Sequence, residues 1–196
     1  MMNIDEYAFS HGQVISKIWL CEELEKCITS RANIYIFGGW YNVLGFMLLT
    51  RHPEQYETIV NIDIDPDAIN AANKLCDAWV CLPTKVINIV GDCNEGPHSI
   101  PPSSVVINCS VEHFESNNWF FKLPKDTLVC IQSSNMLDPE HPWDIKQPSP
   151  DIDSFTQKFP VRDTLFLGEK RIQYDHFGYT RFMLIGRTWH LTEFLL

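Results

Sequence analysis

The sequence predicts an α/β domain whose mostly parallel, doubly wound sheet ends in an antiparallel carboxyl-terminal hairpin. Short, fully apolar runs rich in β-formers alternate with helical stretches up to about residue 130. Such runs are typical of parallel strands that are covered on both faces. Two further strand-like stretches, 164–174 and 179–187, then flank the turn-forming run 175–178, as in a hairpin.

Length and composition favour one domain spanning residues 1–196, without a linker or a repeat. The chain has 196 residues and is 45% hydrophobic, which suits a globular domain with a sizeable core. The formal net charge is −10 and no basic run occurs. Non-specific nucleic-acid binding is therefore disfavoured. We expect a small-molecule or protein substrate, and the sequence does not predict an oligomeric state.

The seven cysteines show no C-x-x-C spacing, so neither a disulfide framework nor a zinc site is indicated. They resemble the buried, reduced thiols of a cytoplasmic protein. The first residues, MMNIDEYAFSHGQ, are acidic and polar, so no signal peptide is expected. The longest apolar stretch, 34–49, is short for a membrane span and contains glycines.

The amino-terminal part, residues 1–30, is expected to be a helical segment. Residues 1–10 are predicted to be loosely held. His11–Cys27 carries apolar residues at helical spacing with charges between them, which predicts an amphipathic helix that packs on the sheet.

The rest of the fold is predicted to be built outward from residues 34–65. The apolar strand 34–37 is followed at once by Gly38-Gly39 and then by a buried helix over 42–50. Two glycines allow a tight turn and the close approach of a ligand to the backbone. The next strand, 59–64, ends with Asp63, which is placed to bind ribose hydroxyls from an exposed strand end. The alternative is a simple turn followed by an acidic strand end.

Later elements follow the same alternation. The predicted helices are 67–75, a short aromatic helix or turn at 117–121, and 151–159, and the remaining predicted strands of the parallel part are 86–90, 105–108 and 128–131. Residues 93–104 read as a loop, and 79–82 are apolar but ambiguous. The proline-rich stretch 136–160 is in place to act as a lid, with His141 and Trp143 in it, and an ordinary surface loop is the alternative.

The order of IYIFGGWYN, IVNIDIDPDAINAAN, VINIVGDCNE, VVINCSVEHF, TLVCIQSSN and YTRFMLIGR resembles the class I S-adenosylmethionine-dependent methyltransferases over residues 30–187. The resemblance implies a Rossmann-like sheet of seven strands with the last one antiparallel. It also implies S-adenosyl-L-methionine as the cofactor and methyl transfer as the reaction.

The resemblance assigns cofactor positions at the strand ends. By this resemblance, the backbone would pass the methionine part of the cofactor at Phe37, Gly38, Gly39 and Trp40. Asp63 would hold the ribose hydroxyls. Ile64 would pack on the adenine and Asp92 would contact its amino group. Asn108 and Cys109 would lie near the sulfonium, with residues 110–113 lining the methyl-transfer site.

The first motif departs from the family pattern. Phe37 takes the usual acidic place, and Trp40-Tyr41-Asn42 replaces the later glycines. These aromatic residues either stack on the cofactor or weaken its binding. No N-P-P-[YF] or D-P-P-Y follows the fourth strand, so the substrate is not implied, and the motif GGWYN indicates a divergent subgroup.

His113 and Glu112 are the predicted catalytic residues because they directly follow the fourth strand, at the ligand-binding edge of such sheets. His113 is predicted to take a proton from the acceptor, while Glu112 orients it or holds a cationic substrate. The alternative is that Glu112 starts a helix and His113 packs against Phe114 or Trp119. Arg181 is expected to be a structural partner for a carboxylate. No metal is predicted.

Residues 132–135 place further amides and hydroxyls at this edge, where they are candidates to orient a small polar substrate or the amino-acid end of the cofactor. Three functions remain open: methyl transfer to a small molecule or protein side chain, transfer of the aminocarboxypropyl group, and a non-catalytic binding module that keeps the fold.

Overall fold

A computed structural model describes residues 4–77, 84–95, 99–136 and 145–189. The helices are α1 His11–Cys27, α2 Val43–Arg51, α3 Pro66–Asp77, α4 Asn118–Phe121 and α5 Ile152–Lys158, with 3-10 turns η1 Glu6–Phe9, η2 Pro53–Gln55 and η3 Val111–His113. The strands are β1 Ala32–Phe37, β2 Tyr56–Asp63, β3 Lys85–Val90, β4 Val105–Asn108, β5 Leu128–Ser134, β6 Val161–Gln173 and β7 Gly178–Thr188.

The strands form one seven-stranded sheet in the order β3-β2-β1-β4-β5-β7-β6. β1 to β5 are parallel, and β7 is antiparallel to both β5 and β6. This confirms the predicted sheet with its antiparallel carboxyl-terminal hairpin. The predicted hairpin turn also matches, because Tyr174 N–H donates to the carbonyl of Phe177 (2.8 Å).

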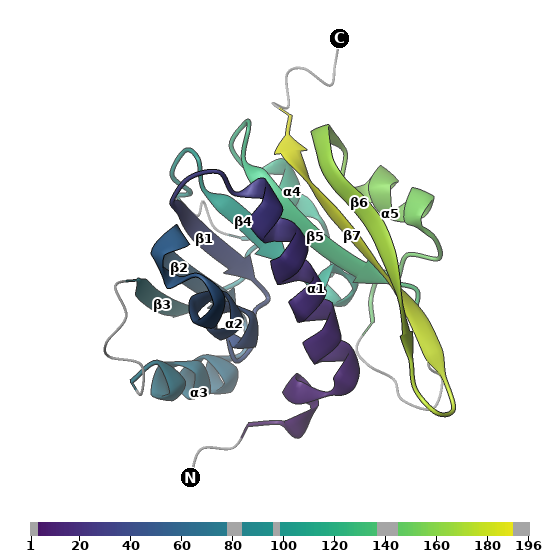
Figure 1. Ribbon diagram of the computed structural model, residues 1–196, viewed down its shortest axis with the longest axis horizontal. Helices are drawn as coiled ribbons and strands as arrows, with labels where there is room; N and C mark the ends of the chain where they lie inside the picture. Colours follow the sequence, from purple (N-terminus) through teal and green to yellow (C-terminus); the bar gives the residue numbers. More distant parts are fainter. Residues whose placement is uncertain (1–3, 78–83, 96–98, 137–144, 190–196) are drawn as a thin grey trace.

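Alternate residues of each central strand serve two separate cores, because successive side chains point to opposite faces. In β1, Ile34 and Ile36 join the core beneath α1 and α2. Phe37 joins the second core, with Trp119 of α4 and Phe155 of α5. Figure 1 shows α1 crossing one face of the sheet while α4 and α5 lie on the other. The long apolar runs in the sequence therefore reflect burial on both faces.

Two local predictions need correction. The fifth strand, predicted over 128–131, extends further: Gln132-Ser133-Ser134 are its last three positions, and all are buried. Residues 4–10, predicted to be loosely held, are packed: Ala8 is 2% exposed in a small core with Tyr41 and Ala68. The reason is the 3-10 turn η1, which folds the segment back against the start of α2 and against α3.

Several predictions fall on residues that the structure does not describe, namely 1–3, 79–82, the middle of loop 93–104, His141, Trp143 and the last seven residues. Among the described residues, no helix has the length and apolar character needed to cross a membrane.

Candidate cofactor and acceptor site

The ends of β1, β2 and β3 are aligned by backbone hydrogen bonds. Gly38 N–H donates to the carbonyl of Ile62 (2.9 Å), and Gly91 N–H donates to the carbonyl of Asp63 (2.9 Å). These bonds continue the parallel ladder for one residue beyond each strand. The glycine turn, Asp63 and Asp92 are thus neighbours at one edge of the sheet, as the sequence predicted.

Asp63 itself is more enclosed than an exposed strand end would be, since it is 8% exposed. Its Oδ2 accepts the backbone N–H of Trp40 (2.6 Å), and its Oδ1 accepts that of Asp65 (3.0 Å). The glycine turn folds over the end of β2, which covers the carboxylate. Burial raises the pKa of Asp63, although these hydrogen bonds oppose the rise. Each carboxylate oxygen can accept more than one hydrogen bond, so lone pairs remain for a ligand.

Next to this carboxylate lies an exposed apolar side chain. Ile64 is 71% exposed, which is unusual for isoleucine. Asp92 follows β3, and its Oδ1 accepts the N–H of Asn94 (2.7 Å). The edge therefore offers a carboxylate, a bare apolar surface and a second carboxylate across two adjacent strands. Their roles toward a nucleoside stay predictions.

The glycine turn is crowded on the side where a ligand would pass. Gly38 has φ +64°, a left-handed conformation that favours glycine. A Cβ built on Gly38 would lie 2.7 Å from Cε2 of Phe114, so the phenyl ring sits directly against the turn. Phe37 is 1% exposed and packs edge-to-face on Trp119 (5.6 Å between centroids). Phe37, in the family's acidic place, is thus a core residue.

A network of four asparagines, which was not predicted from the sequence, holds the glycine turn in place. Asn88 Oδ1 accepts from Nδ2 of Asn42 (3.0 Å) and of Asn61 (3.3 Å), and Asn88 Nδ2 donates to Asn73 (3.0 Å). Asn61 also donates to the carbonyl of Trp40 (3.2 Å). The available signal was an asparagine inside each of two apolar strands, IVNID and VINIV, where buried polar groups need partners.

After β4 the chain turns toward the predicted catalytic pair. Asn108 and Cys109 are buried at the strand end. Asn108 Oδ1 accepts the N–H of Ser110 (3.0 Å), and Ser110 Oγ donates to the carbonyl of Gly38 (3.2 Å). These bonds shape η3, which carries Glu112 and His113, and connect it to the glycine turn.

Glu112 forms a buried ion pair with Arg181 of β7, with side chains that are 4% and 5% exposed. Ser134 Oγ donates to the same oxygen, Oε1 (3.1 Å), and Arg181 Nε donates to Ser16 Oγ of α1 (3.3 Å). Arg181 was expected to be a structural partner of a carboxylate. The structure confirms this, and the carboxylate is that of Glu112. The charge of Glu112 is thus matched within the protein by Arg181, and its role toward a substrate stays a prediction.

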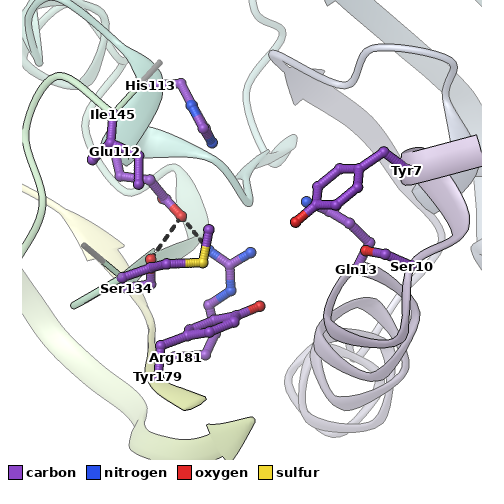
Figure 2. A pocket seen from close by; sticks show the side chains of 10 residues that line it. Tyr7, Ser10, Gln13, Glu112, His113, Ser134, Ile145, Tyr179 and Arg181 are labelled. Atoms are coloured by element: carbon purple, nitrogen blue, oxygen red, sulfur yellow. Dashed lines mark hydrogen bonds and ion pairs between the residues drawn. The ribbon is translucent and has the colours of Figure 1, made fainter. Parts of the chain in front are cut away.

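Glu112 and His113 line a pocket between α1 and the ends of β5 and β7 (Figure 2). Its lining residues are Tyr7, Ser10, Gln13, Glu112, His113, Ser134, Met136, Ile145, Tyr179 and Arg181. Figure 2 shows Tyr7, Ser10 and Gln13 facing Glu112 and Arg181 across the pocket. None of the predicted cofactor-binding residues lines this pocket. The amino-terminal contribution was missed because residues 1–10 carry no periodic pattern.

The part of the predicted lid that the structure describes is fixed to η3. The backbone N–H groups of Lys146 and Gln147 both donate to the carbonyl of Glu112 (2.7 and 3.0 Å). Gln147 Nε2 donates to the carbonyl of Phe114 (2.9 Å). Lys158 in turn donates to the carbonyl of Pro148 (2.9 Å). Residues 145–149 therefore support η3, and the role of the stretch as a cover for a substrate stays a prediction.

The fold places the chain among proteins shaped like the class I S-adenosylmethionine-dependent methyltransferases. No family model matches the sequence, and no curated protein matches it. Solved structures do match in three dimensions. The YcgJ protein from Bacillus subtilis aligns with a TM-score of 0.65 and 9% identity, over 88% of this chain and 99% of that one.

Several of the matches are methyltransferases or putative methyltransferases by name. A SAM-dependent methyltransferase from Aquifex aeolicus has a TM-score of 0.57 and 11% identity, covering 93% of this chain and 99% of that one. Magnesium protoporphyrin IX methyltransferase from Synechocystis PCC 6803, with bound SAM, has a TM-score of 0.59 and 8% identity, over 89% of this chain and 79% of that one. At identities this low, the structural similarity establishes the fold and nothing about the function.

Proposed function

We propose that this protein is an S-adenosylmethionine-dependent methyltransferase that acts on a small molecule or on a protein side chain. The observation that carries the proposal is the composition of the β1–β3 edge. Asp63 retains unused lone pairs beside the bare surface of Ile64, and Asp92 follows the adjacent strand. A carboxylate next to an apolar surface is the combination that a ribose with an attached flat base requires.

The chain's residues fit the cofactor well at its nucleoside end. Asp63 would hold the ribose hydroxyls, Ile64 would pack on the adenine, and Asp92 would contact the adenine amino group. When bound, the cofactor supplies an electrophilic methyl group on a sulfonium. Toward the methionine end, the fit requires the ring of Phe114 to rotate away from Gly38, because the two are in contact.

On the acceptor side, Glu112 and Arg181 form a fixed, neutral pair, and His113 lines the same pocket. His113 would accept a proton from the acceptor as it is methylated. Burial raises the pKa of Tyr7 to about 12, so this phenol stays protonated at neutral pH and serves as a donor that positions the acceptor. Glu112 acts as a positioning residue, because Arg181 and Ser134 already use one of its oxygens.

A non-catalytic binding module is the second candidate, and the aromatic first motif favours it. Phe114 rests on Gly38, and Phe37 is part of the core instead of an acidic contact. If Phe114 does not move, the fold persists without its cofactor.

The test is calorimetric titration with S-adenosylhomocysteine on wild type and Asp63→Asn. Asn keeps one oxygen for Trp40 or Asp65 but removes the charge, so we expect a tenfold or greater loss of affinity. Asp67→Asn, an exposed acidic residue in the first turn of α3, is the matched control and should bind like wild type. No binding by wild type would favour the binding module, and equal binding by Asp63→Asn would remove Asp63 from the site.

Once a substrate is known, the products identify the reaction. Release of S-adenosylhomocysteine supports methyl transfer, whereas release of methylthioadenosine indicates transfer of the aminocarboxypropyl group. His113→Ala should lower turnover while leaving cofactor affinity unchanged, and unchanged turnover would exclude His113 as the base.

A further inference from the structure

Both glycines of the turn after β1 are covered by side chains of the protein itself. A Cβ on Gly38 would lie 2.7 and 2.9 Å from Cε2 and Cζ of Phe114, and a Cβ on Gly39 would meet Oδ1 of Asn61. In a turn that binds a ligand, glycines allow that ligand to approach the backbone closely. A ligand at this turn must therefore displace one of the two side chains.

The side chain of Asn61 is held in place and does not yield to a ligand. It is fully buried, and its Nδ2 donates to the carbonyl of Trp40 (3.2 Å) and to Oδ1 of Asn88 (3.3 Å). Moving this amide would break both hydrogen bonds and leave buried polar groups unpaired, which is costly. The face of Gly39 therefore stays closed.

The ring of Phe114 is different, because only the backbone of this residue is held by hydrogen bonds. Its N–H donates to the carbonyl of Val111 (3.1 Å), and its carbonyl accepts from Nε2 of Gln147 (2.9 Å). The ring is partly buried at the margin of the second core, where it meets the ring of Trp119 (6.4 Å between centroids). Rotation to another side-chain rotamer moves such a ring without breaking a hydrogen bond, so the ring is the part that yields.

Gly38 does not withdraw from the ring, because its backbone is bonded on both sides. Its N–H donates to the carbonyl of Ile62 (2.9 Å), and its carbonyl accepts from Oγ of Ser110 (3.2 Å). The ends of β2 and β3 are more open: Ile64 is 71% exposed, and a Cβ on Gly91 would lie an ordinary 3.7 Å from Ile62. The candidate nucleoside half is therefore accessible, whereas the glycine turn is closed by one movable ring.

We propose that Phe114 is a gate that controls the entry of the methionine part of the cofactor. With its ring against Gly38, the site takes a nucleoside that ends at its 5′ sulfur. With the ring turned away, the longer chain passes the glycine turn. A ligand that needs the open form loses affinity in proportion to the rarity of that form. The inference rests on the proposed function for the identity of the ligand, and it adds the residue that sets the affinity.

The experiment uses two nucleosides that differ in the chain beyond the sulfur. S-Adenosylhomocysteine carries that chain, and 5′-methylthioadenosine has a methyl group in its place. Calorimetric titration gives both affinities for wild type, Phe114→Ala, Phe114→Leu and Phe121→Ala. Leucine keeps an apolar side chain against the core and is the milder change. Phe121 is 43% exposed on α4, so Phe121→Ala is the matched control.

Phe114→Ala should bind S-adenosylhomocysteine about tenfold or more tightly than wild type does, because the open form no longer has to be populated against the ring. Phe114→Leu should shift the affinity in the same direction by a smaller factor. The methylthioadenosine affinity of both variants should stay unchanged, and Phe121→Ala should match wild type with both ligands. A ring that only supports the fold or packs on the ligand would give the opposite sign, since its removal would weaken binding.

A second measurement needs no variant, so it holds even if the Phe114 variants do not fold. In the free protein, NMR should show a nuclear Overhauser effect between the ring protons of Phe114 and the α protons of Gly38. Methylthioadenosine should leave this contact in place, and S-adenosylhomocysteine should abolish it. A contact that persists in wild type saturated with S-adenosylhomocysteine overturns the gate, and so does an unchanged or weaker S-adenosylhomocysteine affinity in both Phe114 variants.

Failure of the proposed function looks different from failure of the gate. In that case no protein of the set, the Phe114 variants included, binds either nucleoside, which removes the nucleoside site and the gate with it. If methylthioadenosine binds and the Phe114 variants leave the S-adenosylhomocysteine affinity unchanged, the gate alone is refuted. Binding of S-adenosylhomocysteine by Phe114→Ala and not by wild type supports both.

Discussion

The two halves of the sheet's carboxyl edge are built in different ways. At β1–β3, the candidate nucleoside site consists of residues at consecutive strand ends, joined by backbone hydrogen bonds and by Asp63 to Trp40. At β4–β7, the pocket depends on side chains that are distant in sequence: Arg181 contacts Glu112 and Ser16. The stability of the first half should therefore be sensitive to changes in backbone geometry. The stability of the second half should be sensitive to buried charges that lose their partners.

The largest effect is expected from Arg181→Met, which leaves Glu112 as a buried carboxylate without its partner. Breaking a buried pair by removing one member costs about 3–5 kcal/mol of unfolding free energy. Urea unfolding at neutral pH measures the loss. Arg51→Met is the control, because its pair with Glu25 lies at the surface and should cost about 1 kcal/mol or less. Equal losses for the two variants would refute the difference between the halves.

The next effect is that of Gly38→Ala in the glycine turn. The left-handed φ strains alanine, and the added Cβ meets the ring of Phe114 at 2.7 Å. We expect a loss of about 1–3 kcal/mol, seen as a fall of roughly 2–12 °C in Tm. At Gly91 a Cβ would contact Ile62 at an ordinary 3.7 Å, so Gly91→Ala should have little effect. A similar fall for Gly91→Ala would contradict this account.

Lys17 should make stability depend on pH in a way that the glycine turn does not. Burial lowers its pKa in the folded state, so between that pKa and about 10.5 the unfolded chain binds more protons. Stability then rises with pH across this window. We expect the unfolding free energy of wild type, minus that of Lys17→Met, to increase with pH between pH 7 and pH 10. The subtraction removes contributions from other titrating groups, and a constant or falling difference would show that Lys17 is not desolvated.

The smallest effect on stability is expected at Ile64. Because the side chain is 71% exposed, Ile64→Ser should leave the unfolding free energy within about 0.5 kcal/mol of wild type. If adenine packs on it, affinity for methylthioadenosine should fall severalfold, as titration would show. Glu57, an exposed residue of β2, the strand that Ile64 follows, provides the control Glu57→Ser, which should bind normally. Unchanged affinity for Ile64→Ser would place the base elsewhere.

Much of the nucleoside half could be predicted from sequence because it depends on local signals. Apolar runs gave the strands, Gly38-Gly39 gave the turn, and Asp63 and Asp92 came directly after predicted strands. A parallel ladder brings consecutive strand ends together, so positions along the chain become neighbours in space. The asparagine network was missed because hydrogen bonds between side chains depend on register and not on composition.

The acceptor half could be predicted only in part. Glu112 and His113 were found because they directly follow β4, and both line the pocket. Their neighbours across the pocket were not found, since nothing in the sequence indicates that η1 brings Tyr7, and α1 brings Gln13, to the same place. Arg181 was assigned a carboxylate without knowing which one, because 25 acidic residues compete in the sequence.

The sequence by itself determined the order of strands and helices, the buried central strands and the location of the polar strand ends, because hydrophobic periodicity and turn residues act locally. Tertiary structure decided which charges meet, that Phe114 covers Gly38, and that the amino-terminal turn closes one side of the pocket. The physical reason is that side-chain pairing in a buried site depends on packing between elements far apart in the chain, where desolvation makes each unpaired group costly.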